Sequence, residues 1–447
     1  MTKRANIDIN FNIQSRLAYL KSLGDDYWSF KEAYKRDYSH SYFRYPAMMV
    51  PQMIRKILDE LCSADPTIKH VHDPFVGSGT ILTESILRGL DFTGRDINPL
   101  SILLCKVKSG PLYEKALYSK INRLLKEISL DSKNNVEIKF KNIDKWFRKD
   151  IQFDLSRIKR SIKKENSLWA RRFFWVVLAE TVRQVSNSRS TTYKLHIRDE
   201  AQIATRKIDT IQIFTTLLLN NYSNLNTFRQ QLKERNYLNK NSYLYQVNLT
   251  LGDAREKLNV SKKYDLVLTS PPYGDNHTTV TYGQYSYLPL QWIDLEDIDK
   301  QASATYLNTI TAIDRMSLGG INYKEDKFKQ ELLRISPTYK GYVNAFHNKP
   351  ERFINKITAY FYDLNECLNP ILDNLNENGY LIWTLGNRTV AGTVIRLDKV
   401  LIELFANKDI ELIDIIYRPI SNKRMASKNK SSKTILKESI LIFRKGS

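Results

Sequence analysis

Short runs of apolar residues recur along the chain, and each run is bounded by polar or turn-forming residues. Their length and their content of β-branched residues predict seven strands, at residues 68–72, 91–96, 245–250, 264–269, 380–385, 410–417 and 438–443. Apolar residues near helical spacing predict helices between them, at residues 47–62, 81–88, 351–375 and 393–406. Strands that alternate with helices predict an α/β fold with a mostly parallel sheet covered on both faces, and the last two strands predict a closing antiparallel hairpin.

Two segments interrupt this alternation. Residues 111–240 have a helical pattern and contain no glycine. Within them, residues 168–178 predict a buried helix whose aromatic side chains belong to the core. Residues 294–350 form a second insertion with balanced charge. The chain therefore divides into three parts of one α/β unit (1–110 with an N-terminal helix, 245–293 and 351–447) and two insertions (111–244 and 294–350).

Positive charge is concentrated in two places. The 447 residues carry a formal net charge of +21. Residues 111–240 hold 27 basic and 13 acidic residues, and residues 418–437 hold seven basic residues and no acid. A basic surface that served only solubility would be spread more evenly, so this concentration predicts a polyanionic partner such as a nucleic acid.

Other bulk properties exclude several classes of protein. The longest purely apolar run, residues 173–179, is too short to span a bilayer, and no apolar segment follows the first basic residues as it would in a secretory signal. Cys62, Cys105 and Cys367 are scattered without the spacing of metal ligands. We therefore expect a cytoplasmic protein with no membrane segment and no bound metal.

Residues 73–80, Asp-Pro-Phe-Val-Gly-Ser-Gly-Thr, follow one predicted strand and open a predicted helix. Gly77 and Gly79 allow the backbone to turn tightly and to approach a ligand closely. The third glycine of a dinucleotide site is missing. An acid at Asp73 also suits the ammonium group of an amino-acid moiety better than a phosphate.

Two further acids stand at strand ends. Asp96 ends the next strand about 20 residues later, where an acid accepts hydrogen bonds from ribose hydroxyls. Asp253 follows a third strand and would suit an adenine amino group. The carboxyl ends of parallel strands meet at one edge of a sheet. Any one acid would equally suit a turn or a helix cap, but the three together predict S-adenosylmethionine as the cofactor.

A second motif, Thr-Ser-Pro-Pro-Tyr-Gly at residues 269–274, directly follows a predicted strand. Pro271 and Pro272 fix the backbone and remove two N–H donors. The Ser270 hydroxyl and a carbonyl of Ser270 or Pro271 would accept hydrogen bonds from an exocyclic amine, and the Tyr273 ring would stack on the base. These four residues predict direct methyl transfer by positioning, without a covalent intermediate. Taken alone, the tetrapeptide would equally suit a rigid turn.

With these motifs, the chain resembles the amino-methyltransferase family of DNA methylases, which modify cytosine N4 or adenine N6. Residues 73–80 match the family's cofactor motif, and residues 269–274 match its catalytic loop in the Ser-Pro-Pro-Tyr form typical of cytosine-N4 enzymes. Adenine enzymes more often carry Asp or Asn in place of Ser270. The resemblance covers residues 40–110, 245–293 and 350–447.

The resemblance implies a Rossmann-like class I methyltransferase fold, interrupted by a large helical insertion. It also implies S-adenosylmethionine as cofactor, double-stranded DNA as substrate and a bacterial restriction-modification role beside a restriction endonuclease. The implied cofactor contacts are Tyr45, Pro46, Asp73, Phe75, Gly77, Gly79, Thr80, Asp96 and Asp253. The chain departs from the usual family order because its third cofactor strand follows the long insertion, so the region that recognises the target sequence is left open.

A target amine inside a duplex is out of reach, so the base would be flipped into the pocket. The basic insertion and the basic loop between the last two strands are the candidate DNA contacts. Their candidate residues are Arg183, Arg189, Lys194 and Arg198 in the first, and Lys423, Arg424 and Lys428 in the second. A solvated helical face or a basic loop without a partner would carry the same residues.

Three alternative functions share these motifs. The first is an adenine-N6 DNA methyltransferase, and the second is an RNA methyltransferase acting, for example, on guanine N2 of tRNA. The third is a methylase-fold subunit that binds DNA without chemistry. The sequence argues against a methylase of cytosine carbon-5, because such an enzyme needs a thiolate nucleophile, usually in a Pro-Cys pair, and none of the three cysteines follows a proline.

Overall fold

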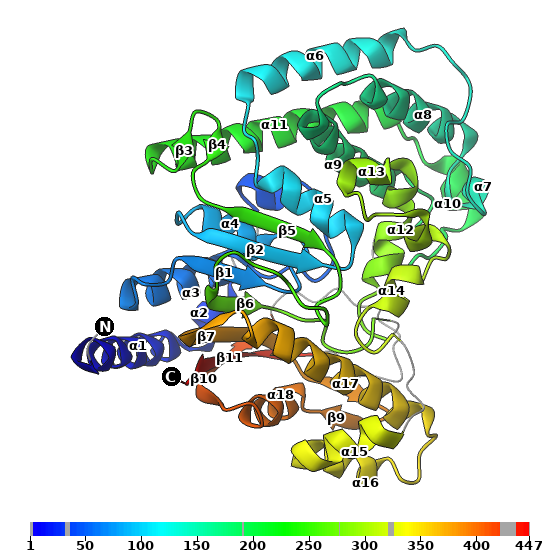
Figure 1. The fold of residues 1–447 in the computed structure, drawn as a ribbon. Coiled ribbons are helices and arrows are strands. Elements are labelled where there is room, and N and C mark those ends of the chain that lie inside the picture. Colours follow the sequence, from blue (N-terminus) through cyan, green and yellow to red (C-terminus); the bar gives the residue numbers. More distant parts are fainter. Residues whose placement is uncertain are drawn as a thin grey trace.

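A seven-stranded sheet forms the centre of the molecule (Figure 1). The computed structural model describes residues 3–31, 36–189, 192–276, 278–320, 326–420 and 435–446. The strands, in their order across the sheet, are β10 (Ile410–Pro419), β11 (Lys437–Lys445), β7 (Leu375–Gly386), β6 (Tyr264–Thr269), β1 (His70–Asp73), β2 (Asp91–Asp96) and β5 (Val247–Leu251). Neighbouring strands from β7 to β5 are parallel, whereas β11 is antiparallel to both β7 and β10. The predicted Rossmann-like methyltransferase sheet with its closing hairpin is confirmed.

Two hydrophobic clusters cover the sheet. Leu266 and Leu268 of β6 belong to one cluster and Val267 to the other, because successive side chains of a strand point to opposite faces. The first cluster includes residues of α3 (Pro51–Ala64), α4 (Thr80–Ile86) and α5 (Pro99–Lys108), and the second those of α17 (Arg352–Leu372) and α18 (Leu397–Ala406). A parallel sheet needs this cover on both faces.

Helices dominate the first insertion and lie along the β5 side of the sheet (Figure 1). Its elements are α6 (Glu114–Leu130), α7 (Ile143–Trp146), α8 (Lys149–Lys163), α9 (Leu168–Val185), α10 (Glu200–Thr205), α11 (Thr210–Glu234), β3 (Leu238–Asn239) and β4 (Ser242–Tyr243). Phe173, Phe174 and Trp175 of α9 are fully buried, as predicted for core aromatics. Their cluster is the same one that covers the sheet, so the insertion packs continuously onto the α/β unit.

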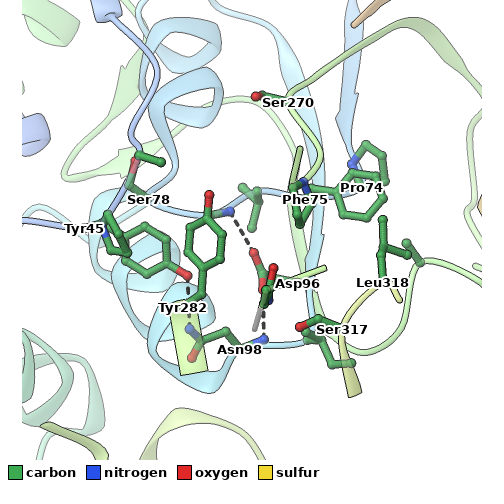
Figure 2. Close-up of a pocket in the computed structure, with 18 of the residues that line it drawn as sticks. Tyr45, Pro74, Phe75, Ser78, Asp96, Asn98, Ser270, Tyr282, Ser317 and Leu318 are labelled. Carbon is green, nitrogen blue, oxygen red and sulfur yellow. Dashed lines mark hydrogen bonds between the residues drawn. The ribbon is translucent and has the colours of Figure 1, made fainter. Parts of the chain in front are cut away.

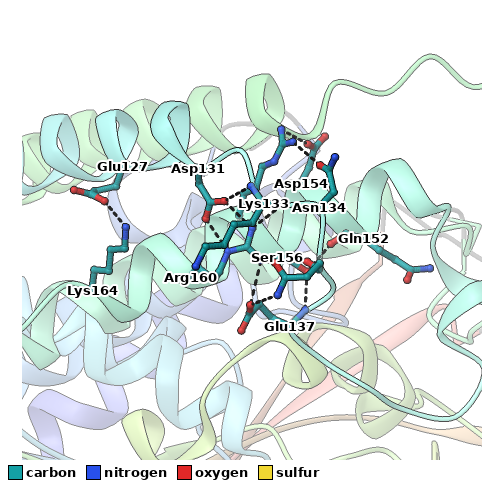
Figure 3. A network of polar contacts seen from close by, with 12 residues as sticks. Glu127, Asp131, Lys133, Asn134, Glu137, Gln152, Asp154, Ser156, Arg160 and Lys164 are labelled. Carbon is teal, nitrogen blue, oxygen red and sulfur yellow. Dashed lines mark hydrogen bonds and ion pairs between the residues drawn. The ribbon is translucent and has the colours of Figure 1, made fainter.

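Part of the insertion's positive charge is neutralised within it (Figure 3). Arg160 of α8 donates to Asp131 at 2.7 Å and to Glu137 at 3.1 Å. Lys164 donates to Glu127 at 2.6 Å. These two basic residues tie helices together, so their side chains are engaged within the protein and not free for a partner.

The second insertion joins the first. It contains α13 (Leu295–Ile298), η2 (Ala304–Leu307), α14 (Ala312–Met316), α15 (Asp326–Ile335) and α16 (Pro337–Ala345). Asp297 of α13 accepts hydrogen bonds from Arg171 and from the Trp175 indole of α9, each at 2.7 Å. Asp297 of the second insertion therefore binds two side chains of the first insertion and joins the two insertions.

Six further elements complete the described fold. They are α1 (Lys3–Ser22), α2 (Gly24–Ser29), η1 (Tyr38–Ser41), α12 (Tyr282–Trp292), β8 (Arg388–Val390) and β9 (Thr393–Ile395). The helix predicted at 393–406 is wrong over its first residues, because Thr393–Ile395 form β9 of the β8–β9 hairpin and the helix begins only at Leu397. Ala391 and Gly392 have φ values of +45° and +83°, so the chain turns sharply there and returns as a strand. The helix predicted from residue 47 begins at Pro51, because proline is favoured in a first helical turn and Ala47 has φ +46°.

Within the described part of the chain, no helix is both long and apolar enough to cross a membrane. The same residues contain no group of three or more His, Cys, Asp or Glu side chains that would hold a metal ion.

Candidate active site

A hollow of about 880 Å³ opens beside the carboxyl ends of β1, β2, β5 and β6 (Figure 2). This is the edge at which open α/β sheets bind ligands. Of the predicted cofactor-binding residues, the wall includes Tyr45, Pro46, Phe75, Gly77, Thr80, Asp96 and Asp253. Of the predicted catalytic residues, it includes Ser270 and Pro272. The two motifs, far apart in sequence, therefore meet at one cavity.

The glycine turn between β1 and α4 packs against residues of α5. Gly77 and Gly79 have φ values of +50° and +72°, a region that glycine adopts without strain. Gly79 is also confined by space, since a Cβ there would lie 2.9 Å from the Cys105 sulfur. The buried Lys108 amine donates to the Ser78 carbonyl at 2.6 Å, and burial lowers the pKa of this lysine to about 8.

Asp96 lies in the cavity wall and organises the backbone around it (Figure 2). Its carboxylate accepts from the Gly77 N–H and the Asn98 N–H, each at 2.8 Å, and from the Ser101 hydroxyl at 2.9 Å. Burial raises the pKa of Asp96. Asn98 in turn donates to the Tyr45 hydroxyl at 3.0 Å. One acid thus couples the glycine turn to the start of α5 and leaves a polar face toward the cavity.

Asp73 lies behind the wall instead of in it. Its side chain is fully buried, and one carboxylate oxygen accepts from the Thr269 hydroxyl at 2.6 Å and the Phe75 N–H at 3.1 Å. Its other oxygen is buried without a partner among the described residues. Burial raises the pKa of Asp73 to about 7. The acid links the glycine turn to the end of β6, and its contact with a cofactor ammonium group stays a prediction.

Asp253 lies in the wall but shares its carboxylate with a neighbour. Arg255 donates to both oxygens of Asp253 at 3.0 Å. The same arginine donates to Asp363 of α17 at 2.6 Å. Arg255 thereby fixes the position of Asp253 at the end of β5, while the carboxylate keeps lone pairs for a further donor.

The Ser-Pro-Pro-Tyr loop leaves β6 and enters the cavity at its first residue. Ser270 and Pro272 line the hollow, whereas Pro271 and Tyr273 lie outside its wall. The Tyr360 hydroxyl donates to the Pro272 carbonyl at 2.6 Å. The Tyr273 hydroxyl lies 3.3 Å from the Ser270 hydroxyl and donates to Glu438 at 3.0 Å. The loop is therefore anchored from α17 and from β11.

Several wall residues do not stand out in the sequence. Tyr282 stacks on Tyr45 with ring centroids 5.8 Å apart, and Ser317 and Leu318 bring the second insertion to the cavity. Asn276 also lines it, is buried, and carries an amide oxygen without a partner among the described residues. Of these, Asn276 had the clearest sequence signal, a polar residue in the loop that follows the second motif.

The predicted DNA-contacting residues divide into four groups. Arg183 is buried against Glu180, with a side chain only 13% exposed, so it is committed within the protein. Arg189 and Lys194 are exposed, and with Arg183 they line a hollow of about 350 Å³ beside Tyr285 of α12. Arg198 is half-buried, and its backbone N–H donates to Asn187 at 2.9 Å. Residues Lys423, Arg424 and Lys428 lie outside the described residues.

The segment 183–198 contacts α12, the helix that follows the catalytic loop in the sequence. The Thr281 hydroxyl, at the start of α12, donates to the Tyr193 carbonyl at 3.2 Å, and the rings of Tyr193 and Tyr285 meet edge to face at 6.0 Å. The predicted basic segment therefore lies against the first turns of α12.

The wall has the chemistry that S-adenosylmethionine requires. Asp96 and Asp253 offer acceptors to hydroxyl and amino groups, and the buried Asn276 oxygen has no donor among the described residues. Tyr45, Phe75 and Tyr282 offer ring surface beside them. A buried acceptor without a partner is costly, so a ligand that supplies N–H or O–H donors fits this cavity.

The chain has a relative that it matches over nearly its whole length. The chain is 32% identical over 437 residues to the Type II methyltransferase M.MvaI of Kocuria varians, and the match covers 94% of this chain and 93% of that protein. No protein-family model matches the chain.

Two solved structures of the rRNA methyltransferase aviRa from Streptomyces viridochromogenes are 9% and 10% identical in sequence to this chain. Their TM-scores are 0.33 and 0.32, and the matches cover 93% and 92% of this chain and 96% and 95% of theirs. Similarity this distant carries no conclusion about activity.

Proposed function

Since the chain belongs to the family of type II methyltransferases, we propose that it transfers a methyl group from S-adenosylmethionine to the N4 amine of a cytosine in double-stranded DNA. A modification role beside a restriction endonuclease is part of the proposal. Its main support is the single cavity whose wall holds both the glycine turn with Asp96 and the Ser270–Pro272 loop.

The chain's own residues would hold the cofactor at one end of this cavity. The cofactor supplies an electrophilic methyl group. Asp96 would accept from the ribose hydroxyls, Asp253 from the adenine amino group, and Asn276 from a donor of the amino-acid moiety. The tight turn at Gly77 would let the backbone approach the cofactor closely.

The Ser-Pro-Pro-Tyr loop would hold the target amine at the other end. The lone pair of an exocyclic amine is delocalised into the base, so the amine is a weak nucleophile. Acceptors at Ser270 would bind its N–H groups and direct the lone pair at the methyl group. Catalysis is then mainly positioning and electrostatic stabilisation. The choice of cytosine over adenine depends on serine at position 270.

The substrate assignment to DNA is supported by charge and by the relative. A net charge of +21 favours a polyanion, and the exposed Arg189 and Lys194 lie on the segment that contacts the start of α12. A base in a duplex would be flipped to reach the cavity. Arg189 and Lys194, together with Lys423, Arg424 and Lys428 outside the described residues, would bind DNA phosphates.

A transfer assay with methyl-tritiated cofactor tests the proposal. We expect label in duplex DNA, recovered after digestion as N4-methylcytosine. Ser270→Ala should lower the rate, whereas the control Ser261→Ala, at an exposed serine, should not. Label recovered only as N6-methyladenine would overturn the base assignment, and label only in RNA would overturn the substrate. DNA binding without transfer would favour the non-catalytic alternative.

A further inference from the structure

A chain of hydrogen bonds connects the closing hairpin to the catalytic loop. The Ser270 hydroxyl lies 3.3 Å from the Tyr273 hydroxyl, which lies 3.0 Å from a carboxylate oxygen of Glu438 on β11. The other oxygen of Glu438 accepts from Arg418 on β10 at 2.5 Å. These residues stand far apart in sequence, and the hairpin brings them together.

Arg418 and Glu438, at the hairpin end of this series of hydrogen bonds, are fixed by their surroundings. Arg418 and Glu438 are cross-strand partners, and their side chains are 7% and 14% exposed. Arg418 also donates to the Trp28 carbonyl at 3.2 Å. Glu438 faces Gly386 of β7, where a Cβ would lie 3.0 Å from the Tyr273 ring. The absent side chain at Gly386 therefore leaves room for Tyr273.

The charges fix the direction of the hydrogen bonds. Arginine is always charged and only donates, and a nearly buried cation needs an ionised partner. Glu438 is therefore a carboxylate, which only accepts. Tyr273 has one proton and must give it to Glu438, so the Tyr273 oxygen accepts the proton of Ser270. Burial raises the pKa of Tyr273 well above its usual value, which keeps this proton in place.

The consequence appears at Ser270, which lines the cavity. Its only proton points away toward Tyr273, so its lone pairs are presented to the cavity. A group with N–H donors, such as an exocyclic amine, matches these lone pairs. A ring nitrogen or a carbonyl oxygen, which only accepts, does not. Without Glu438, Tyr273 could donate to Ser270 instead, and the serine proton would then face the amine.

We infer that Glu438, held by Arg418, is a positioning residue that acts through Tyr273 to keep Ser270 an acceptor for the target amine. The inference rests on the proposed function, since it concerns the same reaction. It adds a determinant from the last strand of the sheet and limits the substrate class to exocyclic amines.

The test is steady-state methyl transfer to duplex DNA by wild type, Glu438→Gln, Tyr273→Phe and the corresponding double variant. Each single variant should lower kcat about 10- to 100-fold, the effect of one charge-assisted hydrogen bond. Cofactor Kd and the KM for DNA should change less than about threefold, because the loss occurs at the amine. The double variant should be no slower than either single variant, since each substitution breaks the same series of hydrogen bonds.

The Ser270→Ala background supplies a second criterion. There Glu438→Gln should have no further effect on kcat, because no serine hydroxyl is left to orient. A destabilised hairpin would instead lower activity equally in both backgrounds. Tyr273→Phe keeps the Arg418–Glu438 pair, so it remains informative even if Glu438→Gln fails to fold. Glu411→Gln, at an exposed position of β10, is the control and should retain wild-type kcat.

Unchanged kcat in both single variants, or additive losses in the double variant, would overturn the inference. Its failure is distinguishable from failure of the proposed function. Wild-type transfer to cytosine with unaffected variants refutes the positioning role alone. Wild-type transfer to adenine with the predicted variant pattern refutes the base assignment alone. A wild-type protein that methylates no nucleic acid refutes both.

Discussion

Replacing Asp73 with asparagine separates two roles for this acid. The sequence predicts a contact with the cofactor's ammonium group, whereas the structure places a fully buried carboxyl behind the cavity wall. Asparagine can keep both observed hydrogen bonds, because its amide oxygen can accept from Thr269 and Phe75 as the carboxylate does. Its amino group would occupy the position of the oxygen that has no partner among the described residues.

The magnitude follows from the pKa of Asp73, which burial raises from 3.8 to about 7. Between these two pH values the native state binds one more proton than the unfolded chain. The free energy of unfolding therefore falls as pH rises, by about 1.4 kcal/mol per pH unit. The stabilisation is complete below pH 4 and is lost by about pH 7, a total of about 4 kcal/mol. Asparagine does not titrate, so the Asp73→Asn variant should gain about 3 kcal/mol relative to wild type between pH 5 and pH 8.

Urea unfolding followed by circular dichroism at pH 5, 6, 7 and 8 measures this gap, and calorimetry measures cofactor Kd on the same samples. We expect the gap to widen with pH and Kd to change less than about threefold. Asp26→Asn, which removes a fully exposed carboxylate, is the control for the loss of one charge. A constant gap together with cofactor binding weakened more than about 30-fold would refute this reasoning and restore the ammonium contact.

Three further substitutions test other parts of the site. Gly79→Ala should destabilise the protein by about 1–3 kcal/mol in urea unfolding, because its φ is +72° and the new Cβ would lie 2.9 Å from Cys105; an unchanged midpoint would contradict this. Asp96→Asn should weaken cofactor binding about 10- to 100-fold in calorimetry, because the amide cannot replace all of the carboxylate's acceptors; unchanged Kd would remove Asp96 from the cofactor site. Lys194→Gln should reduce the slope of log K for DNA binding against log salt concentration by about one unit. Arg183→Gln should instead lower stability by about 1–3 kcal/mol, because the buried Glu180 loses its cationic partner; the reverse pattern would show that Arg183 contacts DNA.

The fold was predictable because both signals that define it are local. Seven apolar runs and two short motifs at strand ends were enough to predict the sheet and its closing hairpin. Gly77, Asp96 and Ser270 lie in one wall because parallel strands present their carboxyl ends at the same edge. That rule depends on the strands running parallel, which their alternation with helices predicts.

The rest depends on contacts that a linear pattern does not contain. Asp73 and Asp96 look alike in the sequence, but only packing decides that the first is buried behind the wall. The charge of residues 111–240 likewise did not show that Arg183 is paired with Glu180. Glu438 reaches the catalytic loop only because β11 pairs with β7, an arrangement that follows from the tertiary fold.

Sequencing that distinguishes methylated bases, applied to DNA from cells that express the chain, tests the central claim most directly. It reports the modified base and its sequence context in one experiment, with cells expressing Ser270→Ala as the matched control. The account predicts N4-methylcytosine at one recurring sequence in the wild-type sample and its loss in the control. N6-methyladenine at a recurring sequence would contradict it. So would DNA without added methylation from cells in which the expressed protein is folded and binds the cofactor.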